Sequence, residues 1–173
     1  MPAKRKVYFL KGLPASGKTT WANRKLASSN LSGKIRAVRA NKDDIRDELG
    51  ARAESIVVRQ ELQFVTEAMT SGRHVIIDNT HFNPIYEWQY RALAEEYGYE
   101  FEIVSFEDVA VEECIRRDRE RRKSIGESAI LRMDEYRRCL FPDKVAAMKS
   151  EWLMKTERAE QRKQRAAGKA ETE

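Results

Sequence analysis

Cysteine is scarce in this sequence, and long apolar runs are absent from it. Cys114 and Cys139 are the only cysteines among 173 residues, and their spacing matches neither a CxxC pair nor a zinc-ligand pattern. We therefore expect two reduced thiols, which excludes a disulfide scaffold and structural zinc. No apolar stretch approaches the roughly 18 residues of a membrane-spanning helix, and Val7–Leu10 is too short for the core of a signal peptide. These absences predict a cytoplasmic protein.

Histidine is equally scarce, and charge of both signs is abundant. His74 and His81 have no partners at metal-ligand spacing, so we expect structural roles for both, with contact to a substrate as the alternative for His81. The sequence is 41% hydrophobic and 35% charged, with a net charge of +5. A chain of this length fits one domain, which buries roughly 70% of its surface on folding. The composition indicates a small, highly charged globule with a modest core.

Strand-like and helix-like patterns alternate through the first two thirds of the chain. The apolar, β-prone runs lie at Val7–Leu10, Ile35–Ala40, Val75–Ile77 and Phe101–Phe106. Such continuous runs are typical of parallel strands that are covered on both faces. The alternation predicts βαβ units and an α/β fold with a central parallel sheet of about four strands.

Helical patterns separate the predicted strands. One apolar stripe at helical spacing ends before Gly72, a candidate helix C-cap, and comprises Val58, Leu62, Val65 and Met69. Asn83 is a candidate N-cap followed by proline, and a second stripe then comprises Ile85, Trp88 and Ala92, before Gly98. From Val111 onward the sequence is helical throughout. We expect a domain over residues 1–155 and a charged helical tail over 156–173.

The clearest motif lies between the first predicted strand and the first helix. Residues 12–20, GLPASGKTT, contain the complete pattern G-x-x-x-x-G-K-[ST]. Glycines let such a loop point successive N–H groups at a phosphate, and the following helix N-terminus attracts the anion. Lys18 is expected to reach the β- and γ-phosphates, and the Thr19 hydroxyl to ligate Mg²⁺. The sequence predicts a site for ATP or another nucleoside triphosphate, formed by Gly12, Ala15, Ser16, Gly17, Lys18, Thr19 and Thr20.

Acidic residues follow the second and third predicted strands, where α/β proteins bind their ligands. Asp78 ends the third apolar run, a Walker-B-like position that holds Mg²⁺, usually through water. The alternative is an N-cap or turn aspartate. After the second strand, Asp43 or Asp44 could accept the proton of an incoming hydroxyl. The alternative there is a pair of acids favoured by a helix dipole.

Six basic residues fall within eight positions in the last third of the chain. Arg117 and Arg121 are four residues apart, so a helix presents both on one face, where they can contact phosphate oxygens. Gly126 and a new helix from about Glu127 predict a hinged lid over residues 115–127. Closure of this lid would bring positive charge to the transferred phosphoryl group.

The same arginines are also compatible with a solvated helix face. Such a face carries i,i+4 ion pairs, for which Glu113 and Arg117 have the right spacing. This alternative fits Arg116 and Arg119 best, because they need not share the face of the other pair.

Four segments, in this order, resemble those of one enzyme family: GLPASGKTTWA, NKDDIRDEL, VIIDNTHFNP and IRRDRERR. The chain resembles the kinase half of bacteriophage polynucleotide 5′-kinase/3′-phosphatase and the kinase modules of other nucleic-acid end-repair enzymes. The likeness runs from about Lys6 to Tyr136, about three quarters of the chain. It implies a P-loop kinase fold, and ATP-dependent phosphorylation of 5′-hydroxyl ends of DNA or RNA.

The resemblance also implies residue roles. Asp43, the first aspartate of the pair, takes the position of the general base. Arg46 takes that of the contact to the phosphate 3′ to the reacting nucleoside. Arg117 and Arg121 keep the R-x-x-x-R pattern that binds the donor's phosphates on the lid.

Two departures from the family limit what the resemblance implies. The sequence contains no DxDxT motif, so it implies no 3′-phosphatase activity. Asp78 lies one place earlier than the family's acid after strand three, which leaves two roles open for it: contact with Mg²⁺ through water, or orientation of Arg46 beside the acceptor. Thr80, in the same motif, is expected on the acceptor side.

A nucleic-acid acceptor needs further contacts beyond Arg46. The net charge of +5 is mild, but a 5′ end requires only a short basic channel. Basic candidates for phosphate contact are Lys42, Arg36 and Arg39. Aromatic candidates for base stacking are Tyr86, Trp88 and Tyr90, although Trp88 continues an apolar stripe and is expected in the core.

Two other functions are compatible with these motifs. A P-loop kinase of a small metabolite, such as a nucleoside or an antibiotic, would use the same base and lid with a closed pocket for its acceptor. An ATP-gated nucleic-acid-binding module would transfer nothing, and Asp43→Asn would leave its function intact. The NKDD-x-R and R-x-x-x-R spacings argue against this module, because an adaptor needs neither a base nor a lid.

Overall fold

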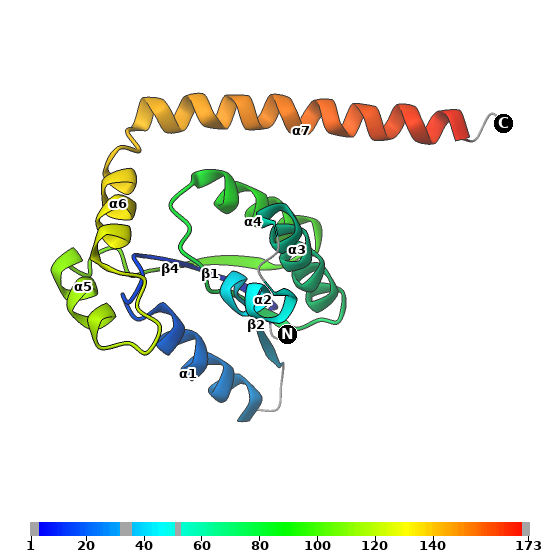
Figure 1. Cartoon of the computed structure of the whole chain (residues 1–173). Helices are drawn as coiled ribbons and strands as arrows, with labels where there is room; N and C mark the ends of the chain where they lie inside the picture. Colours follow the sequence, from blue (N-terminus) through cyan, green and yellow to red (C-terminus); the bar gives the residue numbers. More distant parts are fainter. Residues whose placement is uncertain (1–3, 32–35, 51–52, 171–173) are drawn as a thin grey trace.

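The computed structural model describes residues 4–31, 36–50 and 53–170. Within them the chain forms four strands and seven helices (Figure 1). In chain order these are β1 (Lys6–Lys11), α1 (Lys18–Leu31), β2 (Ala37–Ala40), α2 (Lys42–Leu49), α3 (Glu54–Thr70), β3 (His74–Ile77), α4 (Pro84–Glu96), β4 (Glu100–Ser105), α5 (Val111–Arg119), α6 (Glu127–Arg138) and α7 (Pro142–Ala170).

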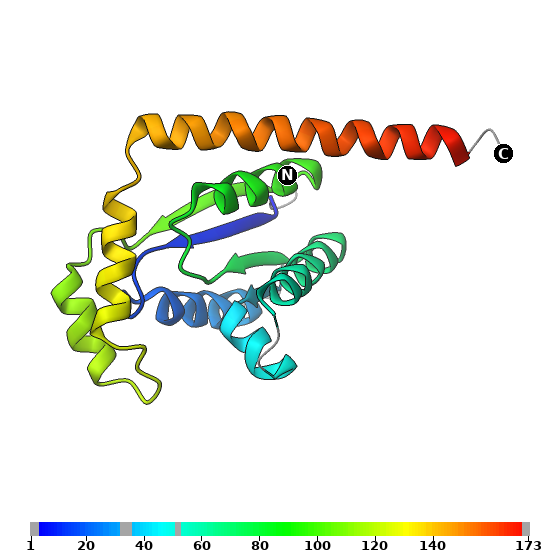
Figure 2. The ribbon, with the colours of Figure 1, turned by 45° about the horizontal axis from the view of Figure 1, so that its top comes forward.

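The strands form one parallel sheet in the order β2-β3-β1-β4. In its register Val7 of β1 lies between Val75 of β3 and Phe101 of β4. Because all strands run in one direction, their carboxyl ends lie at one edge of the sheet. Four segments leave this edge: the phosphate loop, the start of α2, the loop after β3 and the segment leading to α5. Figure 2 shows α5 and α6 beyond this edge. The sheet and its helices confirm the predicted α/β architecture, a P-loop kinase fold.

The core has two layers because alternate residues of β1 point to opposite faces of the sheet. Val7 and Phe9 pack with residues of α3 and α4, such as Val65 and Tyr90. Tyr8 and Leu10, on the other face, pack with Ala22 of α1 and its neighbours. A third cluster joins the phosphate loop to α5 and α6 through Leu13, Phe82, Cys114, Ile115 and Ile130. The helices on either side of the predicted lid loop are therefore packed against the phosphate loop.

The two helical stripes predicted from the sequence agree only in part with the structure. In α3 the buried residues include Val57 and Glu61 as well as Val65 and Met69. In α4 the buried residues are Tyr90 and Ala94; Ala92 is exposed and Ile85 only half-buried. The α3 prediction is thus confirmed for Val65 and Met69, and Leu62 packs against the core. The α4 prediction placed the apolar face two residues from the observed one, because apolar residues occur on more than one face of that helix.

The strand predictions are close to the observed bounds. The fourth strand begins and ends one residue before its predicted range, and the third also includes His74. The second is Ala37–Ala40, whereas the prediction began at Ile35, which lies outside the described residues. Asn83 caps α4 by accepting a hydrogen bond from the Ile85 N–H at 3.0 Å.

The last helix, α7, is continuous from Pro142 to Ala170. It passes beside α4 and extends beyond the rest of the molecule (Figures 1 and 2). Trp152 of α7 lies against Trp88 of α4, with ring centroids 5.9 Å apart. Trp88 is therefore a contact between helices at the surface of the core. None of the helices in the described part of the chain is both long and apolar enough to cross a bilayer.

Candidate active site

The phosphate loop lies between β1 and α1 at the carboxyl edge of the sheet. Gly12 has a φ of 151°, and a side-chain Cβ there would lie 2.8 Å from the Cβ of Phe106, so glycine is required at this position. Ala15, at φ 61°, also adopts a left-handed conformation. Ser16 is buried, and its hydroxyl has no hydrogen-bond partner within the described residues. Thr19 and Thr20, at the start of α1, are exposed.

Lys18 is held inside this loop. Its ammonium donates hydrogen bonds to the carbonyl oxygens of Gly12 (2.8 Å) and Leu13 (2.7 Å), and the residue is 7% exposed. Burial lowers the pKa of Lys18 to about 8, and the charge of Arg121 acts in the same direction while that of Asp78 opposes it. A desolvated cation is thus placed where an anionic ligand would compensate it.

Asp78 is the buried acid of the site, 1% exposed at the end of β3. Neither carboxylate oxygen has a hydrogen-bond partner within the described residues, and Nε of Arg39 lies 3.5 Å from Oδ2. Burial raises the pKa of Asp78, whereas the Thr19 hydroxyl and the charges of Arg39 and Lys18 lower it. A buried carboxylate beside a threonine hydroxyl fits a hydrated Mg²⁺, which takes few protein ligands and keeps several waters.

The start of α2 carries the second acidic pair. Asn41 caps this helix by accepting hydrogen bonds from the N–H groups of Asp43 (2.9 Å) and Asp44 (3.1 Å), and its own amide donates to the Asp78 carbonyl oxygen. Asp43 is 85% exposed, and one of its oxygens accepts a hydrogen bond from Arg46 at 2.5 Å. Asp44 pairs instead with Arg39. The two acids therefore have different partners, although they are adjacent.

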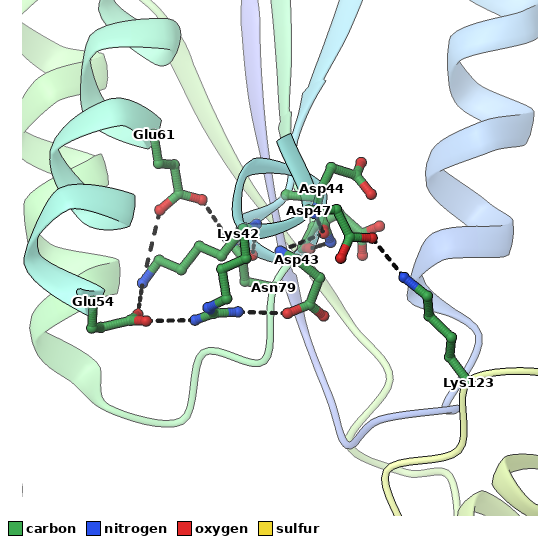
Figure 3. Close-up of polar contacts among 11 residues, drawn as sticks. Lys42, Asp43, Asp44, Asp47, Glu54, Glu61, Asn79 and Lys123 are labelled. Atoms are coloured by element: carbon green, nitrogen blue, oxygen red, sulfur yellow. Dashed lines mark hydrogen bonds and ion pairs between the residues drawn. The ribbon is translucent and has the colours of Figure 1, made fainter. Parts of the chain in front are cut away.

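A charged network from α3 supports the Asp43–Arg46 pair (Figure 3). Arg46 also donates to Glu54 at 2.7 Å. Lys42 extends from α2 toward α3, where its ammonium lies 3.8 Å from Glu54 and 3.8 Å from Glu61. This arrangement occupies Lys42, which is buried, and so removes it from the candidates for contact with nucleic-acid phosphate.

Glu61 is a buried charge that the sequence analysis missed. It is 1% exposed, its pKa is raised by burial, and it accepts a hydrogen bond from the Asn79 amide. Asn79 in turn accepts from the Lys42 N–H at 2.8 Å. Glu61 thus joins α3, the start of α2 and the loop after β3. The available signal was an acid at a buried position of an apolar helix, four residues after Val57 and four before Val65.

The lid arginines divide into two groups. Arg117 lies beside the phosphate loop, with Nη1 3.4 Å from the Ser16 carbonyl oxygen, and also pairs with Glu113 at 2.6 Å. Arg121 lies 3.5 Å from Asp118 and lowers the pKa of Lys18 through its charge. Two other arginines, those that the solvated-face alternative fits best, pair with acids close to them in sequence: Arg116 with Glu113 and Glu120, and Arg119 with Glu127.

The loop of the lid is shaped by one acid and touches α2. Asp118 is 1% exposed and accepts hydrogen bonds from the Ser124 hydroxyl (2.7 Å) and the Gly126 N–H (3.0 Å). Lys123 reaches across to Asp47 of α2 at 2.6 Å (Figure 3). The lid therefore contacts the phosphate loop at one point and the element carrying Asp43 at another.

The remaining candidates have mixed outcomes. His81 is 2% exposed among Phe9, Tyr86 and Tyr90, and burial lowers its pKa to about 3, which makes it a neutral structural residue. His74 Nδ1 accepts a hydrogen bond from the Lys6 N–H at 2.9 Å.

The structure also separates the candidates for base stacking and phosphate contact. Tyr90 is 1% exposed, so the prediction that it stacks on bases is wrong. Arg39 is occupied by Asp44, Asp78 and Asn23. Two candidates are left: Arg36 is exposed just before β2, whereas Tyr86 lines a cavity next to the site, together with Thr80.

Comparisons with known proteins agree with this geometry. A structure of the Pnkp1/Rnl/Hen1 RNA repair complex matches with a TM-score of 0.64 and 24% identity, over 82% of this chain and 47% of the other. A second structure of the Pnkp1/Rnl/Hen1 complex matches with a TM-score of 0.52 and 24% identity, over 68% and 40%. The chain thus spans less than half the length of these two neighbours.

A third solved structure, that of APE1195, is 30% identical, with a TM-score of 0.54, and the match covers 67% of each chain. No curated relative matches the sequence. A family model described as an AAA domain matches residues 7–140. Because this match spans most of the sequence and includes the phosphate loop, the lid and the carboxyl edge of the sheet, the chain belongs to the AAA domain family and is a nucleotide-binding P-loop domain of kinase-like fold.

Proposed function

We propose that this protein is an ATP-dependent polynucleotide kinase that transfers the γ-phosphoryl group to a 5′-hydroxyl end of DNA or RNA. The observation that carries the proposal is the Asp43–Arg46 pair, an exposed acid and a half-buried arginine one helical turn later, at the edge of the sheet that holds the phosphate loop. It combines a carboxylate that can accept a hydroxyl proton with a guanidinium that can bind a phosphate of the same acceptor. A single small alcohol would use only the first of these.

The donor side of the proposed reaction uses residues of the phosphate loop and the lid. Lys18 would neutralise the β- and γ-phosphates, and its buried position makes this interaction stronger than it would be in water. Arg117, already in contact with the loop at Ser16, and Arg121 would add positive charge around the transferred group. Mg²⁺ would be held by the Thr19 hydroxyl and, through water, by Asp78; when bound, it neutralises charge on the phosphate oxygens.

On the acceptor side, Asp43 would remove the proton of the 5′-hydroxyl as the hydroxyl oxygen attacks the γ-phosphorus. The bond from the γ-phosphorus to the bridging oxygen breaks, ADP leaves, and the proton remains on the carboxyl group until it passes to solvent. Arg46 would exchange part of its pairing with Asp43 and Glu54 for a phosphate of the acceptor strand, which fixes the hydroxyl in line. The fold shared with an RNA repair complex supports nucleic-acid ends as the substrate.

A P-loop kinase of a small metabolite is the second candidate. It is favoured by a cavity of about 340 Å³ beside the site, lined by residues of α4 and α6, which could hold a single nucleoside. In this case Arg46 would serve only to position Asp43. The two candidates therefore differ in whether a phosphate 3′ to the reacting hydroxyl improves the acceptor.

An acceptor series tests the proposal. Transfer of γ-labelled phosphate from ATP·Mg²⁺ is measured with a 5′-OH oligonucleotide, a nucleoside 3′-monophosphate and the free nucleoside. We expect the highest kcat/KM for the oligonucleotide and the lowest for the nucleoside. With Arg46→Gln the advantage of the 3′-phosphate should shrink, because the guanidinium that recognises it is gone. Equal or faster transfer to the free nucleoside would replace the proposal by the second candidate.

A further inference from the structure

The cavity of about 340 Å³ beside the candidate site has no assigned role in the proposed phosphorylation of a nucleic-acid end. One wall is the loop after β3 and the first turn of α4, which contribute Phe82 and Tyr86. The other wall is one face of α6, where Arg132, Met133 and Tyr136 recur at helical spacing. Three aromatic rings and a methionine thus enclose the space, and one arginine lies among them.

Two residues that line the cavity, Thr80 and Tyr86, connect it to the acceptor side of the site. Thr80 follows the buried Asp78 by two residues. The ring of Tyr86 lies under the ammonium of Lys42, 4.2 Å from its centroid, and Lys42 directly precedes Asp43. A group bound against Tyr86 would therefore lie next to the segment that carries the proposed base.

Two features of the walls indicate a planar ring as the occupant. Tyr86 contacts the ammonium of Lys42 and the ring of His81, whose centroid is 5.1 Å away, so its place in the wall is preorganised. Tyr136 is 41% exposed and can stack on a ring that enters from solvent. The side-chain amide oxygen of Asn83, also in the wall, accepts a hydrogen bond from the Ile85 N–H.

We propose that this cavity stacks the 5′-terminal nucleobase of the acceptor. The proposal rests on the proposed function. It assigns a binding site to the nucleobase, the part of the terminal nucleotide that the Asp43–Arg46 pair does not hold. Stacking of the base would fix the terminal nucleoside on the side opposite to its 3′-phosphate. The 5′-hydroxyl would then be held from two directions before transfer.

The test compares two 5′-OH oligonucleotides of one sequence, one of which carries an abasic 5′-terminal nucleotide. We expect the wild-type kcat/KM to fall about 5- to 100-fold on removal of the base, the effect of losing one base–aromatic stack. Tyr136→Ala should lose a similar factor with the normal acceptor and little more with the abasic one. Leu131→Ala is the matched control, since Leu131 is exposed on α6 outside the cavity lining, and it should behave like the wild type.

The outcomes separate this proposal from the proposed function. If the wild-type protein phosphorylates both oligonucleotides equally well, or if Tyr136→Ala loses the same factor on both, the cavity does not bind the base and the proposal is overturned while the kinase function stands. No transfer to either oligonucleotide would overturn the end-kinase function and this assignment together. Thermal unfolding of Tyr136→Ala checks that its loss of rate is not a loss of fold.

Discussion

The phosphate loop needs the positive charge of Lys18, but the burial of this side chain disfavours its charged form. Burial lowers its pKa to about 8, so the ammonium is present below this pH and is lost above it. ATP remains fully ionised in this range, since the last phosphate pKa is about 6. We therefore predict that the Kd for ATP is constant from pH 6.5 to 7.5 and then rises, approaching about tenfold per pH unit above pH 8.

Fluorescence or calorimetric titration with ATP at a series of pH values checks this prediction. Lys18→Met should bind more weakly at pH 7 and show no such rise. A wild-type affinity that does not change between pH 7 and 9.5 would contradict the position of Lys18 as the cation of the site.

Glu61 is a buried acid that pairs with Lys42 and accepts a hydrogen bond from Asn79. Removing it would leave Lys42 with one acidic partner in place of two and Asn79 without its acceptor. We predict that Glu61→Ala lowers the free energy of unfolding by about 3 kcal/mol. Glu61→Gln, which keeps the volume and a hydrogen-bond acceptor, should lose less. Urea unfolding measures both, with Glu67→Gln, exposed on the same helix, as a control expected within about 0.5 kcal/mol of wild type.

Among the helices and strands, α2 is the element on which the account depends most. Asn41 both caps α2 and ties it to the Asp78 carbonyl oxygen. Asn41→Ala should cost about 1 kcal/mol of stability through the cap and slow transfer by about tenfold or more, because it frees the segment that places Asp43. Asn41→Ser should regain the stability but stay slow, since serine can cap the helix but has no amide to reach Asp78. A wild-type rate for Asn41→Ser would show that the tie has no role.

The sequence predicted the existence and type of each strand, but not every buried face. β1 and β3 are short apolar runs buried on both sides, which leaves no face to choose. The expectation of coverage on both faces is wrong for β4, an edge strand in which Ile103 is exposed. In α3, by contrast, Glu61 occupies a core position because its partners Asn79 and Lys42 come from other segments. No local pattern reveals that a particular acid has partners 18 or more residues away.

The candidate site follows the same division. The phosphate loop, with Lys18 and Thr19, was predictable because its chemistry lies within nine consecutive residues. The network of Glu54, Lys42 and Glu61 was not, because its members meet only when α3 packs beside α2. The roles expected for Trp88 and Tyr90 were wrong for the same reason. Tyr90, not Trp88, is the residue of α4 that packs in the core against the sheet. Trp88 contacts Trp152 of α7 instead.

At the scale of the whole molecule, α7 is attached to the rest of the chain through few contacts. The Trp88–Trp152 stack is one of them, and such an aromatic pair contributes about 0.5–1.5 kcal/mol beyond the area it buries. We predict that Trp152→Ala releases α7 locally. Amide hydrogen exchange should become faster in α7 and stay unchanged in β1. Leu153→Ala, which alters an exposed neighbour, should leave both regions as they are.

Transfer activity should be independent of this docking, because every proposed catalytic residue lies before α7. A rate for Trp152→Ala far below the wild-type rate, in a variant whose β1 exchange is unchanged, would mean that α7 takes part in the reaction.

The central claim is that Asp43 is the base of a phosphoryl transfer to a 5′-hydroxyl end. The most direct test is single-turnover transfer from γ-labelled ATP to a 5′-OH oligonucleotide by the wild type, Asp43→Asn and Asp44→Asn, since the two adjacent acids have different partners. We predict that Asp43→Asn binds ATP normally and loses about 10²–10⁴-fold in rate, whereas Asp44→Asn loses less than about tenfold, because its pairing with Arg39 lies outside the reaction. A rate for Asp43→Asn close to that of the wild type would contradict the account.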